Sequence, residues 1–111
     1  AQNIKEQATN ETITIKSGYD LYKVKHDDID YIKSDSEYVT FYTQEKKLLS
    51  LMSLKSLENE IPRALFLRVH RSYIVNKTKV TALKGRELLI GETRIPISDS
   101  YFDKVKAELF S

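Results

Sequence analysis

The sequence predicts a single, mainly β domain made of antiparallel β-strands with two short helices. Short runs of alternating apolar and polar residues recur along most of the chain, and such alternation is typical of half-buried strands. Turn-forming residues such as Ser17-Gly18 separate the runs. Only two segments carry apolar side chains at helical spacing, which is too few for a helix-turn-helix fold. A chain of 111 residues is the size of one domain.

The first part of the chain predicts a polar segment followed by a hairpin. Residues 1–10 are polar and show no clear period, so they are predicted to be a linker or disordered N-terminus, and residues 11–111 the domain. Ile13 and Ile15 then alternate with polar neighbours. A second alternating run follows the turn at Ser17-Gly18, so the two runs are expected to pair as a hairpin.

Three more strands are expected before the first helix. His26-Asp27-Asp28 interrupts the pattern with polar residues. Ile29–Lys33 and Tyr38–Thr43 are rich in β-branched and aromatic residues, which favour strands. The polar residues 34–37 between them predict a turn. Lys47–Met52 is the third predicted strand.

Both predicted helices begin after a serine, whose side chain is a favourable N-cap. Ser53 precedes the first helix, and Pro62 marks its end. Ser98 precedes the second helix, which closes the domain. Each helix has one apolar face and is therefore expected to pack on a sheet. The apolar residues are Leu54, Leu57 and Ile61 in the first helix and Tyr101, Phe102, Val105 and Leu109 in the second.

Five short strands are predicted between the two helices. Gly85 and Gly91 mark turns on either side of the fourth. Pro96 in the fifth has no backbone N–H, which places that strand at the edge or end of a sheet. The five are Leu65–Val69, Tyr73–Val75, Lys79–Leu83, Leu88–Ile90 and Thr93–Ile97.

One stretch, Arg63 to Arg86, contains seven of the 18 basic residues and no Asp or Glu. Outside it, 11 basic residues face 16 acidic ones, so this stretch alone makes the chain net basic. Runs of charge are usually solvated faces, but here the arginines are interleaved with hydrogen-bonding side chains. His70, Ser72 and Asn76 are of the types that contact phosphates and base edges. The stretch therefore indicates a surface that binds polyanions.

Residues for catalysis or metal binding are nearly absent from the sequence. There is no cysteine, and the two histidines, His26 and His70, lack the spacing of metal ligands. Asp27-Asp28-x-Asp30 lacks the glycine and distal glutamate of a calcium loop. We therefore expect no enzymatic activity and no cofactor. No apolar run is long enough to span a membrane and no secretory signal is present, so a cytoplasmic protein without membrane contact is expected.

Val-His-Arg-Ser-Tyr-Ile-Val-Asn, residues 69–76, closely resembles the signature of LytTR domains, the β-rich DNA-binding modules at the C-termini of many bacterial response regulators. Four further blocks resemble the family in the same order, and together they cover roughly residues 12–109. These blocks are Asp27–Ile32, Glu37–Val39, Met52–Glu58 and Ile95–Tyr101.

The resemblance implies elongated antiparallel β-sheets with short helices. It also implies sequence-specific binding of double-stranded DNA, with loops placed in successive major grooves on one side of bent DNA. Arg71 is the residue expected to contact a base, because a guanidinium on a bend can reach a guanine edge. His70 is expected mainly to make a structural hydrogen bond behind its loop. Carried over by position, the first loop holds Glu37, Tyr38 and Thr40. The second holds His70, Arg71 and Ser72, with Arg68 and Lys77 as phosphate partners. The third holds Ser98, Asp99 and Ser100.

The third loop departs from the family pattern. Asp99 stands where many members carry a basic residue, often arginine. An aspartate can accept a hydrogen bond from cytosine N4, but it repels phosphate. At the start of a helix its charge is simply stabilising, by about 0.3–1 kcal/mol. The target site of this chain is therefore expected to differ from that of relatives with arginine.

The resemblance also implies an effector domain of a two-component transcriptional regulator. A receiver domain would precede it, and phosphorylation of that receiver would promote a homodimer that binds paired repeats. Two alternatives remain at this point. One is a β-sheet protein-interaction module whose basic face docks an acidic partner. The other is a single-stranded RNA binder that stacks bases on Tyr38, Tyr42 and Tyr73.

Overall fold

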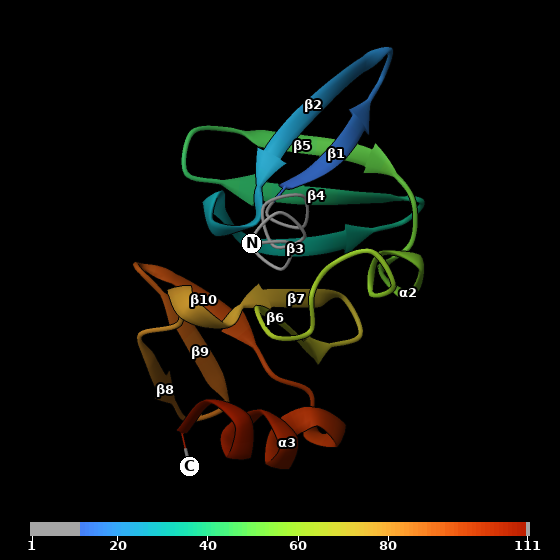
Figure 1. Cartoon of the computed structure of the whole chain (residues 1–111). Helices are drawn as coiled ribbons and strands as arrows, with labels where there is room; N and C mark the ends of the chain where they lie inside the picture. The colour runs from blue at the N-terminus through green and yellow to red at the C-terminus, as the bar shows by residue number, and fades with distance from the viewer. Residues whose placement is uncertain (1–11, 111) are drawn as a thin grey trace, which may run out of the picture.

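The computed structural model describes residues 12–110; residues 1–11 and 111, including the predicted linker at 1–10, lie outside the described part. The described chain forms three antiparallel sheets and two α-helices, so the predicted fold class is confirmed (Figure 1). The two-stranded sheet pairs β1 (Thr12–Ser17) with β2 (Asp20–Lys25). The five-stranded sheet has the order β5 (Lys47–Leu51), β4 (Tyr38–Thr43), β3 (Ile29–Asp35), β7 (Tyr73–Asn76), β6 (Phe66–His70).

The three-stranded sheet has the order β10 (Thr93–Pro96), β9 (Glu87–Ile90), β8 (Ala82–Lys84). The helices are α2 (Leu54–Leu57) and α3 (Asp99–Phe110), and two 3-10 turns, η1 (His26–Asp28) and η2 (Lys77–Lys79), join strands. The principal extents are 38 × 38 × 24 Å, so the domain is broad and flat, and its expected elongation runs along two axes. Among the described residues, no helix is long and apolar enough to cross a membrane.

Two hydrophobic cores lie on opposite faces of the β6–β7 hairpin. Strand side chains alternate between the faces of a sheet. Phe66 and Ile74 therefore enter the first core, with the β1–β2 hairpin and α2, while Leu67 and Val75 enter the second. The second core also contains the three-stranded sheet and the apolar stripe predicted for α3. Figure 1 shows the β6–β7 hairpin between strands β1–β5 on one side and the three-stranded sheet with α3 on the other. Packing on both faces fixes the position of the hairpin.

Asn76 joins the end of this hairpin to the start of the central strand. Its side chain is fully buried, and Nδ2 donates to the backbone oxygens of Ile29 (2.9 Å) and His26 (3.3 Å). Its Oδ1 accepts from the backbone N–H (3.0 Å) and hydroxyl (2.8 Å) of Thr78. A buried amide is favourable only when its donors and acceptors are paired, as they are here.

Three boundaries differ from those predicted. The strand expected at Lys79–Leu83 begins later, at Ala82, because the Asn76 side chain caps the 3-10 turn η2 at its start. Strand β3 continues through residues predicted as a turn and ends at Asp35, so only residues 36–37 form the connection. The first helix ends at Leu57 rather than at Pro62, because the chain continues in turns, as the bond from the Glu60 N–H to the Leu57 oxygen shows; its predicted cap is confirmed, since the Ser53 hydroxyl accepts from the Ser56 N–H at 3.1 Å.

Asn76→Ala is expected to lower the free energy of unfolding by about 2–3 kcal/mol, because the buried backbone oxygen of Ile29 loses this partner and the η2 turn loses its cap at Thr78. Urea unfolding followed by circular dichroism measures the loss. Asn59→Ala is the matched control at an exposed position and should change stability by less than about 0.5 kcal/mol. Similar losses in both variants would contradict the structural role of Asn76.

Candidate nucleic-acid interface

Backbone hydrogen bonds join β3 and the start of α3, which carry the first and third predicted loops, to the β6–β7 hairpin, which carries the second. The Ser34 N–H, at the end of β3, donates to the Ser72 oxygen at 2.8 Å. The Ser98 N–H, at the start of α3, donates to the Val69 oxygen at 3.1 Å. The turns β3–β4 and β6–β7 and the first turn of α3 consequently lie on the same side of the molecule, the right-hand side of Figure 1.

The first loop is a tight two-residue turn. Ser36 has a φ of 57°, a left-handed conformation, and with Glu37 it connects the paired residues Asp35 and Tyr38. Glu37 is exposed, and Tyr38 keeps 47% of its surface exposed, so both can meet a ligand.

Thr40, the third residue predicted in this loop, lies instead within the sheet. It is only 9% exposed, between its strand partners Lys33 and Leu49. The two-residue repeat of a strand puts Thr40 on the same face as Tyr38, but the longer neighbouring side chains can cover its short one. A direct DNA contact by Thr40 does not fit this position.

The second loop presents Arg71 as an exposed residue at the β6–β7 turn. A register shift between Arg68 and His70 bends β6 immediately before the turn. Such bulges redirect side chains at the end of a strand. This bend and the hydrogen bonds to both neighbouring loops place Arg71 in the middle of the candidate interface.

Arg68 holds the shape of this turn. Its Nε donates to the His70 oxygen at 2.9 Å and its Nη2 to the Arg71 oxygen at 2.6 Å. Its Nη1 pairs with the Glu58 carboxylate just after α2. Three of the five guanidinium donors are thus used within the chain, so Arg68 is better placed to position Arg71 than to act as the predicted phosphate partner.

His70 makes the structural hydrogen bond expected of it. Its Nδ1 accepts from the Ser72 N–H at 3.0 Å, and its ring meets the Tyr73 ring edge-on at a centroid distance of 5.5 Å. Burial, and then the charges of Arg71 and Arg68, lower the pKa of His70 below its ordinary value of 6.5. With Nδ1 as an acceptor, the neutral ring carries its proton on Nε2. That N–H remains able to donate to a ligand.

Lys77 does not join the predicted cluster. It follows β7, at the end of the hairpin opposite the turn, on the order of 13 Å along the strand from Tyr73. Its Nζ lies 3.6 Å from the Glu108 Oε2 near the end of α3. A phosphate contact by Lys77 would therefore lie outside the surface formed by the three loops.

In the third loop, the negative charge of Asp99 is paired with an arginine from another part of the chain. The side chain of Asp99 is 93% exposed, and its Oδ1 lies 3.3 Å from Nη1 of Arg86. The Arg86 guanidinium also lies over the Phe102 ring, 4.2 Å from its centroid. Ser98 is half-buried and Ser100 exposed. A basic residue is thus present beside this loop, but it comes from another part of the chain.

Arg86 is a candidate site residue that the sequence analysis did not single out. The sequence contained a clue to the position of Arg86. The two-residue turn at Gly91-Glu92 fixes the β9–β10 register and pairs Glu87 with Pro96. The next position places Arg86 opposite Ile97, whose N–H donates to the Arg86 oxygen at 3.0 Å. The residue after Ile97 is the first residue of the third loop.

Only one of the three tyrosines proposed as RNA platforms presents a largely free ring. Tyr42 stacks on Tyr31 with centroids 4.3 Å apart and an interplanar angle of 13°. Tyr73 packs in the second core beside Tyr31. Tyr38 alone is strongly exposed. This arrangement gives little support to a row of bases stacked on tyrosines.

The family model of the LytTr DNA-binding domain matches residues 19–110. The chain belongs to the LytTR family. A solved structure, the LytTr DNA-binding domain of a methyl-accepting/DNA response regulator from Bacillus cereus, has the same fold with a TM-score of 0.78. The match covers 91% of this chain and 98% of that one at 23% identity. As a member of this family, the chain is a DNA-binding domain.

Curated relatives match the LytTR domain through only part of their own length. The sensory transduction protein LytT of Enterococcus faecalis is 26% identical over 106 residues, which cover 90% of this chain and 44% of the relative. The heme-containing CO-sensing transcriptional regulator RcoM 2 of Paraburkholderia xenovorans is 30% identical over 86 residues, covering 71% of this chain and 32% of the relative. The chain therefore spans less than half the length of these proteins.

The stability of the domain is expected to fall as the pH drops below 6.5, in part because of His70. Its pKa is lowered in the folded state, so the unfolded state binds the proton more strongly. The contribution of neutral His70 to the free energy of unfolding is complete above pH 6.5, and it is lost as the pH falls through the pKa that His70 has in the folded state. Unfolding of wild type and His70→Asn from neutral pH to about pH 5 tests this.

Asparagine is the control because its side-chain oxygen can accept the Ser72 N–H without titrating in this range. The second histidine, His26, is present in both proteins, so any contribution from it cancels in the difference. Equal pH dependence of both proteins would contradict the proposed state of His70.

Proposed function

We propose that this domain reads a specific sequence in double-stranded DNA through the Arg71 turn, flanked by the first and third loops. The observation that carries the proposal is the pair of hydrogen bonds that join β3 and α3 to the β6–β7 hairpin. They bring two exposed turns and a helix start to one side of the molecule. Family membership supports DNA as the ligand.

Arg71 is the proposed base reader, and the other loop residues position the domain. A guanidinium donates two hydrogen bonds to guanine O6 and N7 in the major groove. Arg68 fixes the backbone on which Arg71 stands, and the Nε2–H of His70 can donate to a phosphate beside it. The outer loops would then occupy the successive grooves of bent DNA, through Glu37, Tyr38, Ser98, Asp99 and Ser100.

The regulatory setting is also part of the proposal. LytT and RcoM 2 are, by name, a sensory transduction protein and a transcriptional regulator, and both are longer than this chain. We place the domain downstream of a receiver domain in a two-component regulator acting in the cytoplasm. Phosphorylation of the receiver would pair two copies on repeated half-sites.

Arg71→Ala is expected to weaken binding to the preferred site by about 1–3 kcal/mol and to remove discrimination at one base pair. Selection of sites from random duplex DNA with wild type and variant, followed by affinity measurement, tests both effects. Arg71→Lys should retain charge but lose the bidentate contact. Equal weakening of all sequences by Arg71→Ala would refute base reading.

Arg94→Ala is the matched control for lost charge, because Arg94 is exposed at the other end of β10 and pairs with Glu87. It should leave site selection unchanged. Salt titration of wild type should give a log–log slope of about −0.9 for each phosphate contact. Salt-sensitive binding without enrichment of any site would leave only a basic surface.

Changes in the Arg86–Asp99 pair are expected to alter DNA affinity in opposite directions. Arg86→Ala removes the cation beside the third loop and should weaken binding, whereas Asp99→Asn removes a repelling charge and should strengthen it. Each effect is expected to be about 0.5–1 kcal/mol, because both side chains are well exposed. Titration of one duplex with both variants measures this. Weaker binding by Asp99→Asn would instead indicate that Asp99 accepts a hydrogen bond from a base.

A further inference from the structure

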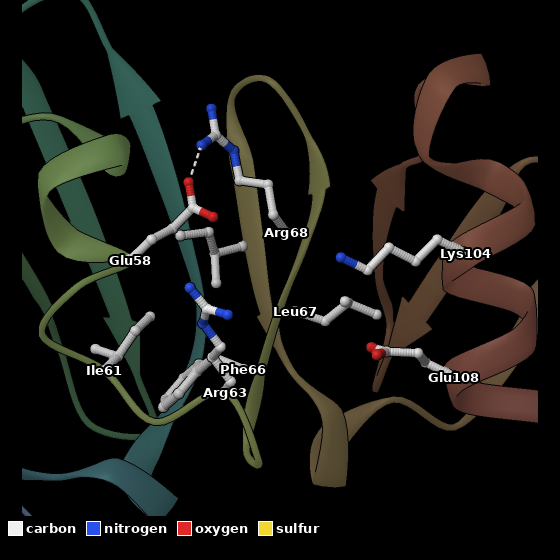
Figure 2. Close-up of a pocket in the computed structure, with 9 residues that line it drawn as sticks. Glu58, Ile61, Arg63, Phe66, Leu67, Arg68, Lys104 and Glu108 are labelled. Carbon is white, nitrogen blue, oxygen red and sulfur yellow. Dashed lines mark hydrogen bonds and ion pairs between the residues drawn. The ribbon is translucent and has the colours of Figure 1, made fainter.

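A groove of about 330 Å³ lies beside β6, between the segment that follows α2 and one face of α3. Figure 2 shows Ile61 and Phe66 on one side of it and Lys104 and Glu108 of α3 on the other, with Leu67 between them. The base of the groove is apolar, because Ile61, Phe66 and Leu67 are buried core residues. Charged side chains form its walls.

Within residues 12–110, the acidic side chains of these walls are ion-paired, whereas two of the basic ones are not. Among the described residues, Glu58 is paired with Arg68 and Glu108 with Lys77. Arg63 and Lys104 are exposed and have no ion-pair partner in the described part of the chain. They belong to opposite walls, so two free cations flank an apolar base. A ligand with carboxylates on both sides of an extended backbone would complement them.

The groove also contains the free edge of a sheet. Strand β6 is at the end of the five-stranded order, paired only with β7. The Lys77 N–H donates to the Leu65 oxygen, and bonding pairs alternate along an antiparallel ladder. The backbone groups of Phe66 and Arg68 therefore point away from β7, as the bond from the Phe66 N–H to the Pro62 oxygen illustrates. The Arg68 N–H and C=O and the Phe66 C=O are left for an added strand.

We propose that this groove binds an extended, acidic segment of a partner protein, which adds as a short strand along the free edge of β6. Backbone hydrogen bonds would supply the register, and alternate side chains would face the two walls. Carboxylates reach Arg63 and Lys104, while small apolar side chains cover Phe66 and Leu67.

Acidic protein fits this groove better than DNA does. The carboxylates of Glu58 and Glu108 line the groove, and their ion pairs reduce but do not remove their repulsion of an anion, which is stronger for the dense charge of a phosphate backbone than for a peptide with a few carboxylates. Nucleic acid also offers no strand to pair with the Arg68 backbone. The groove runs beside β6 from Arg63 to Arg68, whose side chain also holds the Arg71 turn.

The test uses fluorescence anisotropy of a labelled short peptide in which pairs of glutamates alternate with pairs of valines, so that both faces of the extended strand carry carboxylates. Arg63→Glu and Lys104→Glu are each expected to weaken its binding at least about fivefold, because an attraction becomes a repulsion. Lys106→Glu is the matched control: it lies two residues further along α3, on another face of the helix, and should leave affinity unchanged. Urea unfolding followed by circular dichroism verifies the folding of each variant.

Two further measurements separate strand addition from mere attraction. Hydrogen exchange of the Arg68 amide should slow when the peptide binds, and a peptide interrupted by proline should bind far less. Absence of binding, equal weakening by Lys106→Glu, or an unprotected Arg68 amide would overturn the proposal. Displacement of the peptide by duplex DNA, with DNA affinity lost in Arg63→Glu, would identify the groove as a phosphate surface instead.

Discussion

The two-sided burial of the β6–β7 hairpin is the constraint on which the rest of the structure depends. Its side chains alternate between two cores, Phe66 and Ile74 in one and Leu67 and Val75 in the other. A slip of one residue would exchange the two sets and disrupt both cores. The hairpin is therefore held in one register, and the turn at its end is fixed with it.

A rigid hairpin suits the proposed base reading, because Arg71 lies at its turn. Base reading requires a side chain whose backbone does not move between complexes. Here the bend in β6, the Arg68 guanidinium and the His70 ring all hold the turn from within. The hydrogen bonds from Ser34 and Ser98 then tie the outer loops to the same frame. Packing in the two cores thus sets the spacing between the three loops.

The free edge of β6 follows from the same topology. The hairpin ends the central sheet, so one side of β6 has no strand beside it. Proteins usually cover or shorten such edges because they attract other chains. In this domain Pro62 and Ser98 bond to the strand at its two ends. The open portion between them is short and flanked by charge, which favours a selective partner over uncontrolled pairing.

The sequence by itself determined the fold class, the order of the elements and the family. Alternation in Tyr38–Thr43, the cap at Ser53 and the stripe of α3 are local patterns, and local patterns survive folding. The position of Arg71 at a turn was also predicted this way, since a polar residue between two apolar strands belongs at a turn.

Only the tertiary structure decided what the charged and polar residues do. The stretch from Arg63 to Arg86 is free of acid in sequence, yet three of its basic residues pair with acids from elsewhere. Arg68 became a support for the turn, Lys77 moved to the far end, and Arg86 joined the third loop. Thr40 was buried by residues of neighbouring strands. The reason is physical: a side chain finds its partners across strands and helices, and those neighbours are set by packing, which no local pattern contains.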